Sequence, residues 1–241
     1  MLVPPILLFD FDGVVITQKA LEYTALLQLR NKFYKWKNTQ NLRLIDLARL
    51  FEEADSKNRY KALIRAYKVY KRYIPSRWRR LIFFLIFKRN YPKYEIYETL
   101  KPNLEEILIK FKQAGIPLGI VSNTSGKRLD FFRQTLSLDR YFSAYISRDD
   151  TPYRKPHPYP IFSILINIKR KYKFSIDLNN VYLIGDLPTD ILSAKNAYIK
   201  SIALLSGHGT KHDLEEANPT FILPDIKNIL DIDLFKKFLL D

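Results

Sequence analysis

Residues 5–13 read Pro-Ile-Leu-Leu-Phe-Asp-Phe-Asp-Gly, and this stretch indicates the fold of the chain. The run from Pro5 to Phe11 is apolar apart from Asp10, which is typical of a strand buried on both faces of a sheet. Similar short runs recur at residues 117–122, 145–147, 181–185 and 201–205, with a weaker one at 220–223.

Helix-like stretches lie between these runs, at residues 103–114, 127–136, 160–171 and 190–197. Gly115 follows the first of them, where a helix C-terminal cap is expected. Strands that alternate with helices predict an α/β fold, with a Rossmann-like parallel sheet and helices on both of its faces.

Residues 18–99 break this alternation. Helical periodicity appears at residues 20–33, 42–54 and 60–73, and Pro75 and Pro92 predict helix breaks near the end of the segment. We therefore expect a core domain of residues 1–17 and 100–241, and an inserted all-α domain of residues 18–99.

The composition restricts the chemistry. The chain has 241 residues, no Cys and three His, which excludes disulfides, thiolate metal sites and Cys nucleophiles and argues against a His-based metal site. No signal peptide is recognisable, and the longest apolar run, Leu81 to Phe87, is shorter than the roughly 20 residues that a membrane helix needs. We expect a cytoplasmic monomer or homodimer without stable membrane association.

The charge is unevenly distributed. The net charge is +15, and residues 14–100 contain 20 Lys and Arg against seven Asp and Glu. The favoured interpretation is a solvated helical surface, and the alternatives are attraction of an anionic substrate, nucleic-acid binding and membrane contact. For the run from Leu81 to Phe87, burial in the insert or at a dimer interface is favoured over membrane contact.

Polar residues gather after the predicted strands. In an open parallel sheet, ligands bind beyond the carboxyl ends of the strands. Carboxylates crowded at that edge need a cation, and oxygen ligands without His or Cys select magnesium. A hydroxyl, loop N–H groups and a Lys suit a phosphoryl group, and one carboxylate can attack phosphorus while a second transfers the proton. The candidate residues are Asp10, Asp12, Gly13, Ser122, Asn123, Thr124, Lys155, Asp186 and Asp190.

Four segments together resemble the haloacid dehalogenase superfamily, in its phosphoglycolate phosphatase-like branch. They are residues 10–15 (DFDGVV), 122–123 (SN), 155–158 (KPHP) and 185–190 (GDLPTD), in the order of that family's motifs. Residues 204–209 and 213–217 also resemble its last strand and helix. The resemblance implies that the insert is a helical cap that determines substrate specificity.

The resemblance also implies roles. Asp10 is expected to form an aspartyl phosphate, and Asp12 to protonate the leaving group and then activate water. Ser122 and the Asn123 backbone are expected to hold phosphoryl oxygens, and Lys155 to balance charge. Magnesium would be bound by Asp10, the Asp12 carbonyl and Asp186, with Asp190 in support.

The leading hypothesis is thus a magnesium-dependent phosphatase for a small phosphorylated metabolite. Asp12 argues against dehalogenation, because true dehalogenases of the family lack an acid there. Thr17 replaces an acidic residue of many relatives, which affects the details of the cap hinge. The alternatives are a phosphosugar mutase and, in another class, a nucleic-acid-binding protein that uses its basic cap. His157 is interpreted as a loop residue. His208, between Gly207 and Gly209, could reach toward the site, but a plain loop residue is the favoured interpretation.

Overall fold

The structure is a computed structural model that describes residues 4–17, 19 and 76–239. The chain divides into two compact units, one of residues 1–17 and 99–241 and one of residues 18–98. The three helices predicted between residues 20 and 73 lie outside the described residues. Each unit is described separately below.

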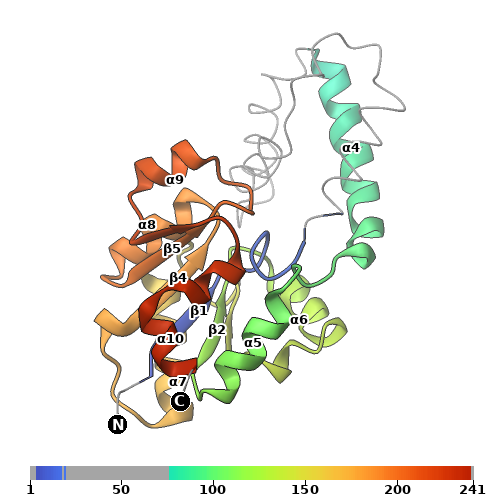
Figure 1. Cartoon of the computed structure of the whole chain (residues 1–241). Coiled ribbons are helices and arrows are strands. Elements are labelled where there is room, and N and C mark those ends of the chain that lie inside the picture. The colour runs from blue at the N-terminus through green and yellow to red at the C-terminus, as the bar shows by residue number, and fades with distance from the viewer. Residues whose placement is uncertain (1–3, 18, 20–75, 240–241) are drawn as a thin grey trace. The chain divides into compact units, whose positions relative to one another are not determined.

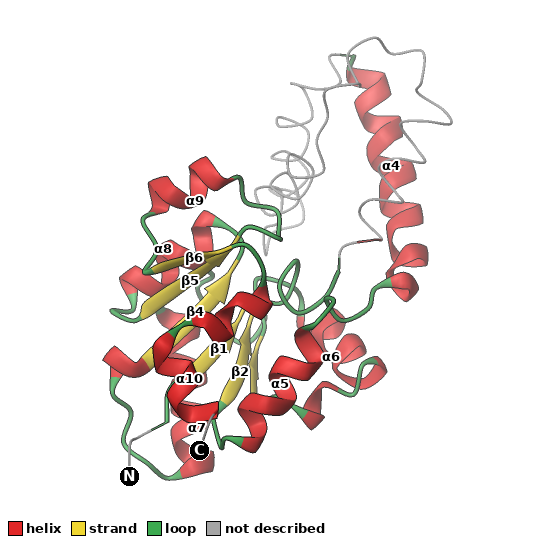
Figure 2. Ribbon diagram, in the orientation of Figure 1, coloured by secondary structure: helices red, strands yellow, loops and turns green. Residues whose placement is uncertain are grey.

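The first unit contains a six-stranded sheet in which every paired strand is parallel, in the order β3-β2-β1-β4-β5-β6 (Figures 1 and 2). The predicted α/β class is therefore confirmed. The strand bounds are β1 (Ile6–Phe9), β2 (Leu118–Val121), β3 (Ala144–Ile146), β4 (Val181–Gly185), β5 (Lys200–Leu204) and β6 (Phe221–Leu223).

Helices cover both faces of this sheet, as expected. The larger ones are α5 (Leu104–Gln113), α6 (Gly126–Thr135), α7 (Tyr159–Tyr172), α8 (Pro188–Asn196), α9 (Lys211–Ala217) and α10 (Asp233–Leu239). Helix α5 ends as predicted, because Gly115 has a φ of +69° and its N–H bonds the Lys112 carbonyl. Helix α10 was not predicted from the sequence.

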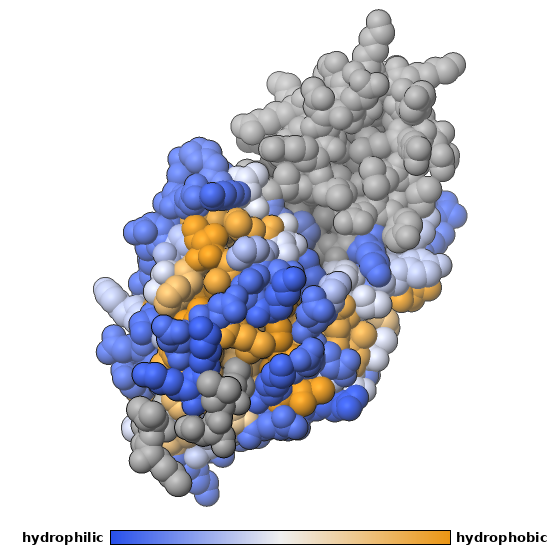
Figure 3. Space-filling model, in the orientation of Figure 1, coloured by the Kyte–Doolittle hydropathy of each residue, from blue (hydrophilic) through white to orange (hydrophobic). Residues whose placement is uncertain are grey.

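The side chains of β1 alternate between two core layers. Leu7 and Phe9 pack with residues of α5, α6 and α10, whereas Ile6 and Leu8 pack with residues of α7 and α8. All four side chains are almost fully buried. This two-sided burial explains why the strand is uniformly apolar, since neither face meets water. On the face shown in Figure 3, apolar areas of this unit lie between charged and polar side chains.

The described part of the second unit contains the helix α4 (Arg77–Tyr94) and the 3₁₀ turn η2 (Glu95–Tyr97). The break expected at Pro92 is wrong, because the helix continues through Pro92 and ends two residues later. Pro92 has no N–H to bond the carbonyl four residues earlier, so the helix continues there without that hydrogen bond.

Trp78, Leu81, Ile82 and Leu85 of α4 are exposed, at 77%, 40%, 47% and 56%. The expectation that the apolar run is buried within the chain is therefore wrong for Leu81, Ile82 and Leu85. Among the described helices, none combines the length and apolar character needed to cross a bilayer.

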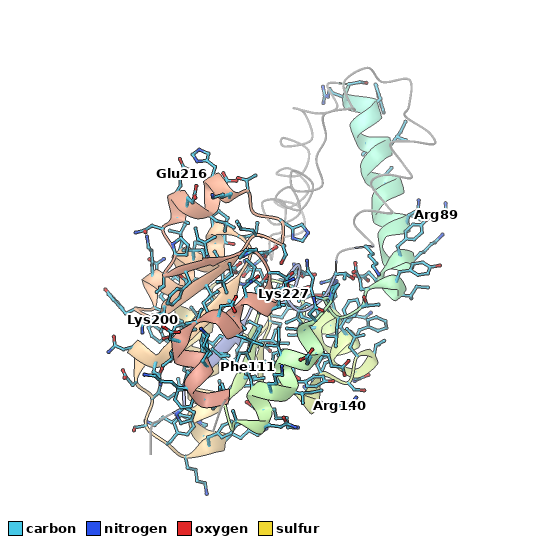
Figure 4. The ribbon with its side chains drawn as sticks, viewed as in Figure 1. Arg89, Phe111, Arg140, Lys200, Glu216 and Lys227 are labelled. Carbon is cyan, nitrogen blue, oxygen red and sulfur yellow. The ribbon has the colours of Figure 1, made fainter. Side chains whose placement is uncertain are left out.

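Helix α5 offers a test of the core packing. Phe111, labelled in Figure 4, is fully buried and packs against Phe235 of α10, with ring centroids 5.8 Å apart. We expect Phe111→Ala to lower the free energy of unfolding by about 3–5 kcal/mol, because it leaves a cavity. The matched Ile109→Ala, on the exposed side of the same helix, should change it by about 0.5 kcal/mol or less. Urea denaturation measures both values, and equal losses would contradict this packing.

Candidate active site

The strand order brings the predicted residues to one edge of the sheet. β1 lies between β2 and β4, where the chain changes the direction in which strands are added, and this is where open α/β sheets bind ligands. Asp10 directly follows β1, Ser122 follows β2 and Asp186 follows β4. These three residues are 5% exposed or less.

Lys155 lies at the centre of the site, in the loop before α7. Its Nζ donates to Asp10 Oδ1 at 2.5 Å and to Asp190 Oδ1 at 2.6 Å. All three residues are buried. The structure thus brings together three residues that were predicted from separate segments. The Lys155–Pro156 peptide is cis.

Asp190 has two roles in the structure. Its Oδ2 accepts hydrogen bonds from the N–H groups of Asp186 (3.2 Å) and Leu187 (3.1 Å), at the start of α8. Its Oδ1 accepts from Lys155. The same carboxylate therefore caps the helix and orients the lysine.

His208 also reaches the site, so its interpretation as a plain loop residue is wrong. Its backbone N–H donates to Asp186 Oδ2 at 2.7 Å, and its ring Nδ1 lies 2.8 Å from the same oxygen. The flanking glycine explains this approach, because a Cβ on Gly207 would lie 2.1 Å from the Asp186 Cβ. His157, in contrast, lies in a loop, where its ring stacks on Tyr153 with centroids 4.2 Å apart.

The loop after β1 is tightly constrained. Phe11 is fully buried, and Gly13 has a φ of +82°. A Cβ on Gly13 would lie 2.4 Å from Asp186 Oδ2 and 2.5 Å from His208 Nδ1. Only glycine therefore fits at this position, both for its backbone conformation and for the close contact.

Asp12 forms an ion pair that was not predicted from the sequence. Arg128 of α6 donates through Nη1 to Asp12 Oδ1 at 2.7 Å and to Oδ2 at 2.8 Å. The same Nη1 donates to the Thr124 hydroxyl at 3.1 Å. An arginine on a helix resembles any surface cation in the sequence, so no sequence signal identified Arg128. For His208, the Gly-His-Gly after β5 was the available signal.

The loop after β2 connects to Lys155 through the side chain of Asn123. Asn123 Oδ1 accepts from the Lys155 N–H at 3.0 Å, and Asn123 Nδ2 donates to the Lys155 carbonyl at 3.2 Å. The Ser122 hydroxyl accepts from the Thr124 N–H at 3.0 Å. Asn123 thus fixes the backbone of the lysine, a role that was not predicted for its side chain.

The site has an excess of negative charge. Burial raises the pKa of Asp10 well above its ordinary value; Lys155 acts in the opposite direction, and Asp190 and Asp186 raise the pKa further. Burial likewise raises the pKa of Asp190. Burial alone would lower the pKa of Lys155, but Asp10 and Asp190 outweigh it and raise the value. Three carboxylates face one ammonium group among these four side chains, which favours a bound cation.

A divalent cation fits the donors present. Ligand oxygens of Asp10, Asp186 and Asp190 lie within 4.8 Å of one another, and all three residues are buried. Asp186 Oδ1 is buried and has no hydrogen-bond partner among the residues that the structure describes, which leaves a ligand atom available. The donors are all oxygens, and such sites favour magnesium over softer metals.

The parallel sheet and the carboxylates at its edge are those expected of a haloacid dehalogenase-like hydrolase, and the comparison of the sequence with family models agrees. The model of the haloacid dehalogenase-like hydrolase family covers residues 7–204. The chain belongs to this family.

Curated relatives match part of the chain. It is 30% identical over 135 residues to a phosphoglycolate phosphatase of Vibrio cholerae, and 29% identical over 134 residues to that of Pasteurella multocida. Each alignment covers 56% of this chain and 57% of the relative, so the chain spans less than two thirds of these curated relatives. A crystal structure of a predicted phosphoglycolate phosphatase from Haemophilus somnus has the same fold, with a TM-score of 0.69, 21% identity and coverage of 95% and 97% of the two chains.

Metal binding can be tested without an activity assay. We expect Mg²⁺ to raise the Tm of the wild-type protein, because a cation that binds only the folded state stabilises it, by about 2.7 kcal/mol at 100 times its Kd. Asp186→Asn should abolish this shift, whereas Asp130→Asn, at an exposed position of α6, should retain it. Calorimetry with and without Mg²⁺ measures the shift, and an equal shift in Asp186→Asn would contradict a metal site here.

Proposed function

We propose that the protein is a magnesium-dependent phosphatase that hydrolyses a small phosphomonoester through an aspartyl phosphate on Asp10. The observation that carries this proposal is the pairing of buried Asp10 with Lys155 at the switch point of the sheet, at 2.5 Å. Lys155 engages Oδ1 of Asp10, so Oδ2 is the oxygen available for attack on phosphorus. Family membership and phosphatase relatives support the same reaction class.

The first step transfers the phosphoryl group. A carboxylate oxygen of Asp10 forms a bond to phosphorus while the bond from phosphorus to the leaving oxygen breaks. Asp12 gives its proton to that oxygen, so the alcohol leaves neutral. The Ser122 hydroxyl, the Asn123 N–H and Lys155 hold the phosphoryl oxygens.

The second step regenerates the enzyme. Asp12, now a carboxylate, accepts a proton from the water that attacks phosphorus, and the bond between phosphorus and Asp10 breaks. Inorganic phosphate leaves, and both aspartates return to their initial states. Mg²⁺ bound at Asp10, the Asp12 carbonyl and Asp186, with Asp190 in support, would neutralise charge on the carboxylates and the phosphoryl group.

The second unit, residues 18–98, is proposed to select the substrate. Its position in the chain, between the nucleophile and the strand β2, is that of the helical cap in the family it resembles. The excess of Lys and Arg in this part of the sequence fits an anionic substrate, which a phosphomonoester is. The relatives named phosphoglycolate phosphatase make phosphoglycolate the first substrate to assay.

The nucleophile can be tested with p-nitrophenyl phosphate. We expect Mg²⁺-dependent release of nitrophenolate by the wild-type protein, and a loss of at least about 10⁴-fold in kcat for Asp10→Asn, because the amide is no nucleophile. Asp130→Asn, which alters an exposed carboxylate, should retain wild-type kcat. Equal activity in Asp10→Asn and wild type, or no activity with Mg²⁺, would refute the proposal.

Product analysis separates the phosphatase from a phosphosugar mutase. With a hexose 1-phosphate, the phosphatase releases inorganic phosphate, because water attacks the phosphoryl group on Asp10. A mutase returns that group to the sugar and produces the 6-phosphate. Recovery of the isomeric sugar phosphate in excess of free phosphate would favour the mutase.

A further inference from the structure

Arg128 lies outside every motif of the site and yet contacts one of its functional residues. We propose that Arg128 is a positioning residue that fixes the carboxylate of Asp12 for proton transfer, an inference that rests on the proposed phosphatase reaction. The contact is charge-assisted and involves both carboxylate oxygens, at 2.7 and 2.8 Å from Nη1.

The backbone on either side of Asp12 is already fixed. Phe11 is buried in the core, and Gly13 lies so close to Asp186 and His208 that a Cβ at this position would overlap both side chains. The remaining freedom of Asp12 is the rotation of its side chain, which a partly exposed aspartate would otherwise retain in water. The ion pair with Arg128 removes this freedom.

Arg128 is itself held from several directions. Its guanidinium carbon lies 5.1 Å from the ring centroid of Phe132 and 5.8 Å from that of Phe11, within the range of cation–π contacts. Its Nη1 donates to the Thr124 hydroxyl, and its backbone N–H donates to the Ser125 hydroxyl, the N-cap of α6, at 3.4 Å. Only 14% of its side chain is exposed. A cation held in this way can orient its partner.

The network continues to the proposed phosphate-binding residues. Thr124 accepts from Arg128 through its hydroxyl and donates through its N–H to the Ser122 hydroxyl, at 3.0 Å. Arg128 thus ties the proton-transfer group to the loop that is proposed to hold the phosphoryl group. The Asp12 side chain remains 26% exposed, so the ion pair leaves it accessible to a leaving group or a water.

Two variants of Arg128 separate the effect of its charge from that of its aliphatic side-chain carbons. Arg128→Met retains an unbranched side chain against the two rings, and Arg128→Lys retains the charge. With p-nitrophenyl phosphate and Mg²⁺, we expect Arg128→Met to lower kcat by about 10–100-fold with little change in KM, because a misplaced catalytic group loses rate and not binding. Arg128→Lys should recover part of the loss.

A double-mutant cycle shows whether Arg128 acts through Asp12. We expect Asp12→Asn to lower kcat by about 10²–10⁴-fold, and Arg128→Met to have no further effect in that background. The matched control is Arg133→Ala on the same helix, which removes an ion pair with Asp139 at 2.8 Å and should keep wild-type kcat.

Each other outcome has a defined meaning. Wild-type or higher kcat in Arg128→Met would overturn the proposal, and so would the same fold loss in the Asp12→Asn background. A rise in KM that persists in that background would assign Arg128 to substrate binding instead.

The failure of the phosphatase proposal is distinguishable from the failure of the positioning role. An inactive wild-type protein would refute the phosphatase proposal itself. An active wild type with an impaired Asp12→Asn and an unimpaired Arg128→Met would refute only the positioning role. If Arg128→Met does not fold, Arg128→Gln takes its place: wild-type kcat overturns the proposal, and a loss that disappears in the Asp12→Asn background supports it.

Discussion

The buried ammonium of Lys155, held between two buried carboxylates, is the interaction on which the site depends. Its Nζ lies 2.5 Å from Asp10 and 2.6 Å from Asp190, in a region nearly closed to water. Burial of charges is costly unless each has a partner, and removal of one partner leaves the other uncompensated. The lysine therefore fixes the orientation of the Asp10 carboxylate. Together with Asp186, these groups still carry more negative than positive charge, which favours the binding of a divalent cation beside them.

The other elements of the core unit position these charged side chains. Parallel strands bring Asp10 and Asp186 to one edge, and the N-terminus of α8 brings Asp190 beside them. Gly13 and Gly207 allow two loops to approach Asp186 more closely than any Cβ would permit. The side chain of Asn123 brackets the backbone of Lys155 from the neighbouring loop. The close approach at the two glycines and the backbone contacts of Asn123 thus hold Asp10, Lys155, Asp186 and Asp190 together.

Much of the core unit was predictable from the sequence, because its signals are strong and local. The uniformly apolar strands predicted a sheet covered on both faces, and the predicted run of residues 181–185 coincides with β4. The polar residues at strand ends predicted the positions of Asp10, Ser122 and Asp186. Contacts between distant segments were not predictable. The ion pair of Arg128 joins residues 116 positions apart, and His208 reaches Asp186 across 22 positions. Such pairings depend on how loops fold over the sheet edge, and the periodicity of apolar residues in the sequence carries no information about loop conformation.

The most direct measurement of the central claim is a crystal structure of the protein with Mn²⁺, which takes oxygen ligands as Mg²⁺ does and scatters anomalously. The account predicts an anomalous peak bound by Asp10 and Asp186, with Lys155 still bridging Asp10 and Asp190. A peak elsewhere, or a cation that displaces Lys155 from Asp10, would contradict the claim that the lysine and a divalent cation together neutralise the carboxylates.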